Sequence, residues 1–196
     1  MAKSSSPEDV VVVGMGCRFP GSATSPNYEA ITLRDIDTQP ELASTGNGTA
    51  ILSNRISYFF DLRGPSVTVD TACSGSLVAI DLAIQSLKSG SVDLAIVGGV
   101  NMILTPDTMF PMSSMGFLSP AGKCFAFDSR ASGYGRGEGA GIVILKRITD
   151  AQGHNDPIRA VIVGHGVNQD GRTSGKALYS PTQVVLQHTP NKVNLD

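Results

Sequence analysis

A short segment around Cys73 carries the residue types that a nucleophilic thiol requires. The β-branched run at 66–70 is expected to be a strand, small residues make a tight turn, and a helix is expected to follow over 75–89. A side chain in that turn is pushed out at the top of the sheet, beside unpaired helical N–H groups and the positive end of the helix dipole. Because that position favours negative charge, we expect Cys73 to be partly ionised and to act as a nucleophile.

The neighbours of Cys73 suit the same chemistry. The N–H groups at the helix start could hold the oxyanion that forms when a thiolate attacks a thioester carbonyl. The small residues Ala72, Ser74 and Gly75 leave room for an incoming acyl group. The arrangement follows the logic of a nucleophile elbow with Cys in place of Ser. The spacing leaves one alternative open, in which Cys73 is a small core residue at a strand–helix junction, because free cysteines are often buried.

Five strands and a central helix would position this turn. Short apolar or β-branched runs predict strands at 10–14, 66–70, 92–100, 140–147 and 158–164. The helix over 75–89 has apolar residues on almost every face, which predicts a buried helix. A second helix is expected over 49–60 from its amphipathic spacing, and a short one around 28–35.

The order of these elements predicts an α/β fold. The strand–helix–strand succession over 66–100 implies parallel pairing with a right-handed crossover. The short polar connector between the last two strands favours an antiparallel pair of neighbours there. We therefore expect a five-stranded mixed sheet, mostly parallel, around a buried nucleophile helix.

Composition limits the function classes. The chain has 196 residues, with 41% hydrophobic and only 16% charged residues and a net charge of −2. No basic stripe supports nucleic acid binding, and no apolar run is long enough to span a membrane, so we expect a cytoplasmic protein. Three widely spaced cysteines argue against a disulfide framework and a structural metal site. The low charge content suggests that a partner or another part of a larger protein covers much of the surface.

Several motifs in order resemble the β-ketoacyl synthases of polyketide assembly, within the thiolase-like superfamily. The residues that carry this resemblance cover most of 10–175 and are, in sequence order, VVVGMGCRFPG, RISYFFDLRGPSVTVDTA, DTACSGSL, GFLSPAGKCFAFDSRASGYGRGEGAG and GVNQDGRTSG. The residues of these motifs are most similar to those of fungal, reducing-type iterative synthases. The resemblance implies a partial ketosynthase over 10–175, being the nucleophile half of a thiolase-like fold, between a flexible N-terminus at 1–9 and an unpatterned tail at 176–196.

The resemblance also implies the roles of individual residues. Cys73 would accept an acyl chain from the phosphopantetheine arm of an acyl carrier protein, with no cofactor bound directly. Ser74 and Gly75 would form the oxyanion site or pocket, and Phe117 would line the acyl channel unless it is an ordinary core aromatic. Lys123 and Arg136 could attract an acidic carrier. In this superfamily the strand near 92–98 runs along a dimer interface, so a homodimer through that strand is expected.

The family's histidine pair is missing from the pattern. Motifs of the HGTGT and GHxE kind, which promote decarboxylation and stabilise the enolate, do not occur, and His154, His165 and His188 do not replace them. The sequence therefore supports acylation of Cys73 better than carbon–carbon bond formation. Three functions stay open: a ketosynthase-type acyltransferase, a non-catalytic accessory or remnant protein that binds a carrier or a larger synthase, and a hydrolase or transacylase that uses Cys73 without condensation.

Overall fold

The chain forms two compact units. The computed structural model describes residues 9–18, 49–103, 106–169 and 183–184. The first unit contains residues 1–17, 53–99 and 141–196, and the second contains residues 18–52 and 100–140. The helix expected around 28–35 and nearly all of the proposed tail lie outside the described residues, so the boundaries of the expected domains stay predictions.

Four strands make one sheet. They are β1 (Val10–Arg18), β2 (Ala95–Asn101), β3 (Gly139–Arg147) and β4 (Ala160–Ile162), in the spatial order β2-β3-β1-β4. A further pair of short strands, β5 (Val167–Asn168) and β6 (Gln183–Val184), is antiparallel and separate from this sheet.

Neighbouring strands of the sheet run antiparallel. In the pair of β1 and β4, Val10 lies opposite Ile162. The pair of β1 and β3 follows the same rule, because the N–H of Ile148 donates to the carbonyl of Asp9 at 2.9 Å where β3 ends and β1 begins. In the pair of β2 and β3, Arg147 at the end of β3 donates to the carbonyl of Val92, shortly before β2 begins. Among the described residues, the expectation of a five-stranded, mostly parallel sheet is therefore wrong in strand number and in direction.

Two further topological expectations fail. The run at 66–70 is extended but joins no strand of the sheet, so the predicted parallel strand–helix–strand unit does not form. The last two predicted strands exist as β3 and β4, but they are not neighbours, since β1 lies between them. The connector, which includes α6 (Ile148–Gly153), is therefore a crossover rather than a hairpin.

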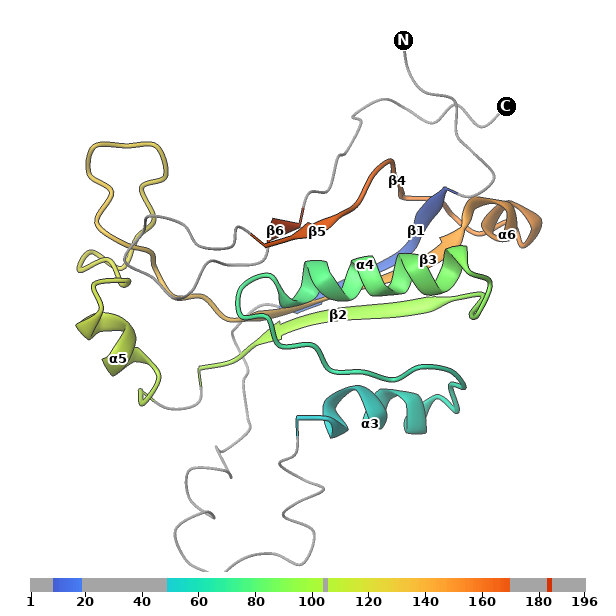
Figure 1. Ribbon diagram of the computed structural model, residues 1–196, viewed down its shortest axis with the longest axis horizontal. Coiled ribbons are helices and arrows are strands. Elements are labelled where there is room, and N and C mark those ends of the chain that lie inside the picture. The colour runs from blue at the N-terminus through green and yellow to red at the C-terminus, as the bar shows by residue number, and fades with distance from the viewer. Residues whose placement is uncertain (1–8, 19–48, 104–105, 170–182, 185–196) are drawn as a thin grey trace, which may run out of the picture. The chain divides into compact units, whose positions relative to one another are not determined.

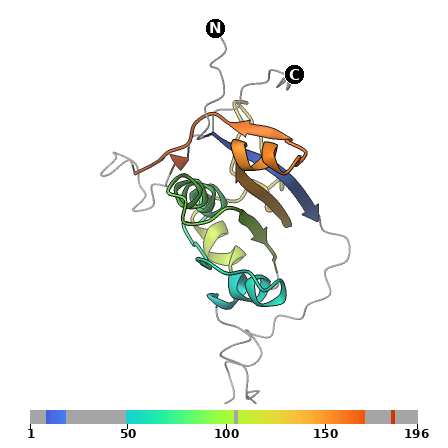
Figure 2. The same cartoon turned by 90° about the vertical axis from the view of Figure 1, so that its right-hand side faces the viewer.

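Alternate residues of β1 serve two separate cores. Val10 and Val12 pack with Ile84 and Leu87 of helix α4 (Gly75–Lys88) in one buried cluster. Val11 points to the other face, where it packs in a second cluster with Ile148 and Ala151 of α6. This division follows from the two-residue period of a strand. Figures 1 and 2 show α4 running along the sheet in the first unit.

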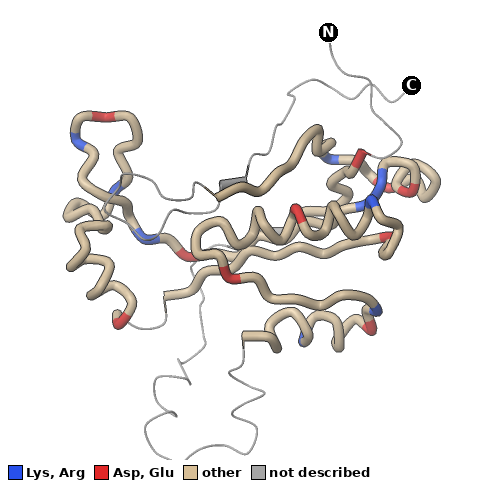
Figure 3. Tube along the Cα trace, viewed as in Figure 1, with Lys and Arg blue, Asp and Glu red and all other residues tan. Residues whose placement is uncertain are grey.

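Helix α4 is buried along one stripe only. Its bounds agree with the predicted 75–89, but only Asp81, Ile84 and Leu87 are buried, and Leu82 is 41% exposed. The expectation of a helix buried on all sides is therefore wrong for this structure. Helix α3 (Ile51–Phe59), also at its predicted place, has no buried residue. Charged positions are sparse along α4 and β2 (Figure 3), so their exposed faces are largely apolar or small.

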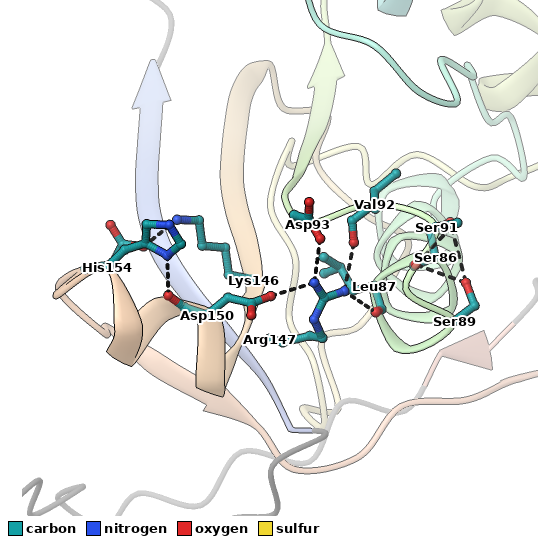
Figure 4. Close-up of polar contacts among 11 residues, drawn as sticks. Ser86, Leu87, Ser89, Ser91, Val92, Asp93, Lys146, Arg147, Asp150 and His154 are labelled. Carbon is teal, nitrogen blue, oxygen red and sulfur yellow. Dashed lines mark hydrogen bonds and ion pairs between the residues drawn. The ribbon is translucent and has the colours of Figure 1, made fainter.

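Arg147 holds the far end of α4 against the sheet (Figure 4). Its Nη1 donates to the carbonyls of Leu87 at 2.8 Å and Val92 at 2.9 Å, and its Nη2 lies 2.6 Å from carboxylate oxygens of Asp93 and Asp150. The hydrogen bond that Arg147 donates to the Asp93 carboxylate is the main cause that raises the pKa of Arg147 above its usual value. The guanidinium thus binds a carbonyl at the C-terminal end of the helix, where a cation is favoured.

The second unit is built around a loop that folds back on itself. Besides helix α5 (Met109–Ser114), it contains a pair of backbone hydrogen bonds between Phe117, Ser119 and Tyr134. Gly133 permits this approach, because its φ is +128° and a Cβ there would lie 2.6 Å from the backbone of Leu118.

Candidate functional site

Cys73 lies on the surface in the turn directly before α4. It is a free, exposed thiol. The turn is closed by the N–H of Gly75, which donates to the carbonyl of Ala72 at 3.1 Å, and the N–H of Ala72 is held by a carboxylate oxygen of Asp70 at 3.0 Å. The alternative in which Cys73 is a sealed core residue is therefore wrong.

The residue before Cys73 has an unusual backbone. Ala72 adopts φ of +55°, in the left-handed region that non-glycine residues rarely occupy. Such a conformation costs on the order of 1 kcal/mol and persists only where surrounding contacts impose it. Here the contacts of Asp70 and Gly75 described above enclose Ala72 on both sides. The turn is thus a fixed bend that separates the extended lead-in from the helix.

Ser74 and Gly75 serve the turn in different ways. Ser74 is buried, its hydroxyl donates to the carbonyl of Thr71 at 2.9 Å, and it lies 2.9 Å from the Thr71 hydroxyl. Its side chain is therefore engaged within the turn. Gly75 allows the helix to start close to the lead-in, because a Cβ there would lie 3.2 Å from the carbonyl oxygen of Val69.

Strand β2 supports the first turn of α4 from below. A Cβ on Gly99 would lie only 2.8 Å from the Cβ of Ser76, which is closer than real Cβ atoms approach. The absence of a side chain at Gly99 therefore sets how near the helix start lies to the sheet. At the adjacent Gly98 a Cβ would meet Ile142 at an ordinary 3.7 Å.

A buried polar cluster on α4 was not predicted from the sequence. Asp81 is buried, and its two carboxylate oxygens accept from Nδ1 of His165 at 2.5 Å and from Nε2 of Gln85 at 2.6 Å. The available signal was a single acidic residue in the middle of an otherwise apolar helix. Since buried carboxylates are found with partners, that residue should have prompted a search for one.

The remaining candidate residues are placed as follows. His154 is exposed and its Nδ1 contacts the carbonyl of Asp150 at 2.6 Å, as expected for a surface histidine. Glu138, in the glycine-rich stretch before β3, accepts the N–H of Ile103 at 2.5 Å, which is a structural contact. Nη1 of Arg136 lies 3.7 Å from the sulfur of Met112.

Phe117 and Lys123 are both exposed and belong to the second unit, so the role of Phe117 in an acyl channel stays a prediction. Within the residues that the structure describes, no three His, Cys, Asp or Glu side chains gather in a way that could hold a metal ion. In the same part of the chain, no helix combines the length and the apolar character needed to cross a bilayer.

The fold and the turn together define a class of protein. The structure places an exposed thiol directly before a helix that packs on the sheet of an α/β protein. Residues 21–151, more than half of the chain, match the family described as beta-ketoacyl synthase, N-terminal domain. The chain belongs to the beta-ketoacyl synthase family, as its motifs predicted.

Individual relatives support this assignment. The chain is 55% identical over 147 residues to a highly reducing polyketide synthase of Penicillium rubens, a match that covers 75% of this chain and 6% of the relative. It is 49% identical over 174 residues to the compactin diketide synthase of Penicillium citrinum, which covers 87% of this chain and 7% of that protein. The chain thus spans only a small part of the length of these relatives.

Solved ketosynthases resemble the structure as well. The ketosynthase from module 6 of the bacillaene synthase of Bacillus subtilis 168 matches with a TM-score of 0.65 and 50% identity, covering 67% of this chain and 23% of that chain. A ketosynthase domain from the oxazolomycin system of a Streptomyces strain matches with a TM-score of 0.64 and 40% identity, covering 65% and 23%. The expected thiolase-like α/β class is therefore confirmed, while the expected strand directions are not.

Proposed function

We propose that the chain is a ketosynthase-type acyltransferase that accepts an acyl group on Cys73. The observation that carries the proposal is the exposed thiol at the beginning of α4, in a chain of the beta-ketoacyl synthase family. The thiolate of Cys73 would attack the thioester carbonyl carbon, forming a new C–S bond. The old C–S bond would then break, and the departing thiolate of the carrier arm would take up a proton from solvent to become the free thiol.

The backbone at the helix start supplies a donor for the intermediate. The carbonyl of Ser74 already accepts from the N–H groups of Leu77 and Val78, at 3.0 Å each. The N–H of Ser76, by contrast, meets no acceptor within the described part of the chain. This N–H, three residues after Cys73, is our candidate oxyanion donor, beside the proposed pocket residues Ser74 and Gly75.

The proposed substrate is an acyl chain on the phosphopantetheine arm of an acyl carrier protein. The proposal rests on the likeness to polyketide synthases. Lys123 is the better candidate for contact with an acidic carrier, because it is exposed while Arg136 is partly buried beside Met112. No cofactor beyond that substrate arm is required for the transfer.

Carbon–carbon bond formation is not part of the proposal. Both histidines among the described residues already have a partner at Nδ1: His154 contacts a backbone carbonyl and His165 contacts Asp81. A decarboxylative condensation needs groups that donate protons and stabilise an enolate. The motifs that carry these groups in the family, of the HGTGT and GHxE kind, do not occur in the sequence.

Intact-mass measurement tests acyl transfer directly. Incubation with an acyl-pantetheine thioester should add one acyl mass to the chain, and peptide mapping should locate it on Cys73 rather than on Cys124, which is also an exposed thiol. Cys73→Ala should remove the adduct, while Cys124→Ala should keep it. Addition of a malonyl carrier protein should give no chain extension.

The outcomes separate the candidate functions. Rapid loss of the acyl group to water would indicate a hydrolase. Absence of any adduct, together with binding of the carrier, would overturn the proposal in favour of a non-catalytic accessory protein. Such a binding role is favoured by the many exposed apolar and aromatic side chains, including Tyr58 at 91% and Phe59 at 79%.

We further propose that the chain forms a homodimer through β2. In the described sheet β2 is an edge strand, and Leu94 and Ile96 beside that edge are exposed. An exposed apolar edge strand is a template for pairing with a second chain. Light scattering after size exclusion should give twice the mass of one chain for the parent and for Leu82→Lys, which changes the outer face of α4. Ile96→Lys should give a monomer, and a monomeric parent would contradict the proposal.

A further inference from the structure

Four hydroxyl groups connect α3 to the segment that leads into the Cys73 turn. The hydroxyl of Ser57 donates to that of Ser66 at 3.1 Å, and the hydroxyl of Thr68 donates to that of Ser53 at 3.3 Å. All four residues belong to the first unit. We call these four residues the hydroxyl ladder. Figure 1 shows the lead-in returning alongside α3 before it reaches the start of α4.

The spacing of the ladder follows from the two local structures. Ser53 and Ser57 are four residues apart, so they lie on one face of the helix. Ser66 and Thr68 are two residues apart, so they lie on one side of an extended segment. Ser57 therefore pairs with Ser66, and Ser53 with Thr68, so the extended segment runs antiparallel to the helix.

The ladder takes the place that a neighbouring strand would have. The lead-in is β-branched and extended, yet it joins no strand of the described sheet. On its other side, the carbonyl of Val69 lies against the start of α4, where a Cβ on Gly75 would be 3.2 Å away. The lead-in is thus fixed between the hydroxyls of α3 and the first turn of α4.

We propose that the hydroxyl ladder positions Cys73 for acyl transfer, an inference that rests on the proposed function of that thiol. Thr68 is five residues before Cys73, and the bend at Ala72 transmits any displacement of the lead-in to the thiol. The four ladder residues are positioning residues, because none of them contacts the reacting atoms. Their hydroxyls fix the distance between α3 and the lead-in, and with it the orientation of the turn.

Matched variants of Thr68 test the ladder. Thr68→Val removes the hydroxyl and keeps the shape of the side chain, whereas Thr68→Ser keeps the hydroxyl. The rate of Cys73 acylation should fall about five-fold in Thr68→Val, the scale of one net hydrogen bond, and should be restored in Thr68→Ser. Alkylation by iodoacetamide is measured in the same samples at Cys73 and at Cys124, which lies in the second unit and should react at the parent rate.

A double-mutant cycle tests the other pair. Ser57→Ala, Ser66→Ala and the double variant should each lower the acylation rate by a similar factor, because either single change removes the same hydrogen bond. Ser86→Ala is the control, since it removes a helical hydroxyl that bonds only to the carbonyl of Leu82. It should acylate at the parent rate.

Failure of the inference is distinguishable from failure of the proposed function. If the parent chain accepts no acyl group, the proposed function is contradicted. The alkylation rate of Cys73 would still test whether the hydroxyl ladder positions the thiol. A parent that is acylated, with ladder variants that react at the parent rate, would overturn the inference alone. A fall in melting temperature with no change at Cys73 would also overturn it, because the ladder would then only attach α3.

Discussion

Gly99→Ala is expected to lower the rate of Cys73 acylation by about 100-fold. The new Cβ would lie 2.8 Å from the Cβ of Ser76, whereas carbon atoms pack best at roughly 3.5–4.0 Å. Because both atoms are fixed to the backbone, no rotamer change relieves the contact. The first turn of α4 must move by about 1 Å, and a displacement of that size can cost 10²-fold in rate.

Gly98→Ala is the matched control for this prediction. It makes the same chemical change one residue earlier in β2, where the added Cβ would lie 3.7 Å from Ile142. Acylation rates of both variants are measured by mass spectrometry, alongside thermal unfolding monitored by circular dichroism. The account of Gly99 is refuted if the two variants are acylated at the same rate.

His165→Leu is expected to lower the free energy of unfolding by about 2–4 kcal/mol. The change leaves the buried Asp81 carboxylate with only the Gln85 amide, and a buried charge without its partner is costly. The estimate is below the value for a fully buried pair, because the His165 side chain is 20% exposed. Urea denaturation measures the effect.

The double variant supplies the control for the pair. Asp81→Leu removes the buried charge itself and should cost less than His165→Leu, because His165 keeps partial access to water. Replacement of both residues by leucine should recover much of the loss, since apolar groups often substitute for a buried polar pair. A single Asp81→Leu variant that is less stable than His165→Leu would contradict this interpretation.

Local patterns predicted the elements well. The apolar runs at 10–14, 92–100, 140–147 and 158–164 each overlap an observed strand, and the periodicity over 75–89 located α4 within one residue. These signals are local, since they depend on side-chain spacing along one segment. The same reasoning placed Cys73 in a turn before α4 but left open whether the thiol is exposed or buried.

Strand direction and partner choice could not be obtained in this way. The run at 66–70 has the composition of a strand, but its hydroxyls bond to α3 instead of its backbone entering the sheet. Whether a β-branched run meets a strand or a helix depends on contacts between distant residues, which one sequence does not display. The partner of Asp81 was hidden for the same reason, because His165 is 84 residues away along the chain.

The alternation along β1 has a consequence for how this protein can vary. Val10 and Val12 share a core with the helix that begins at Cys73, whereas Val11 belongs to the core of α6. A change of size at Val11 would therefore act first on α6, whereas a change at Val10 or Val12 would act first on the helix that begins beside Cys73. The alternation of one strand thus decides whether a core substitution reaches the thiol directly.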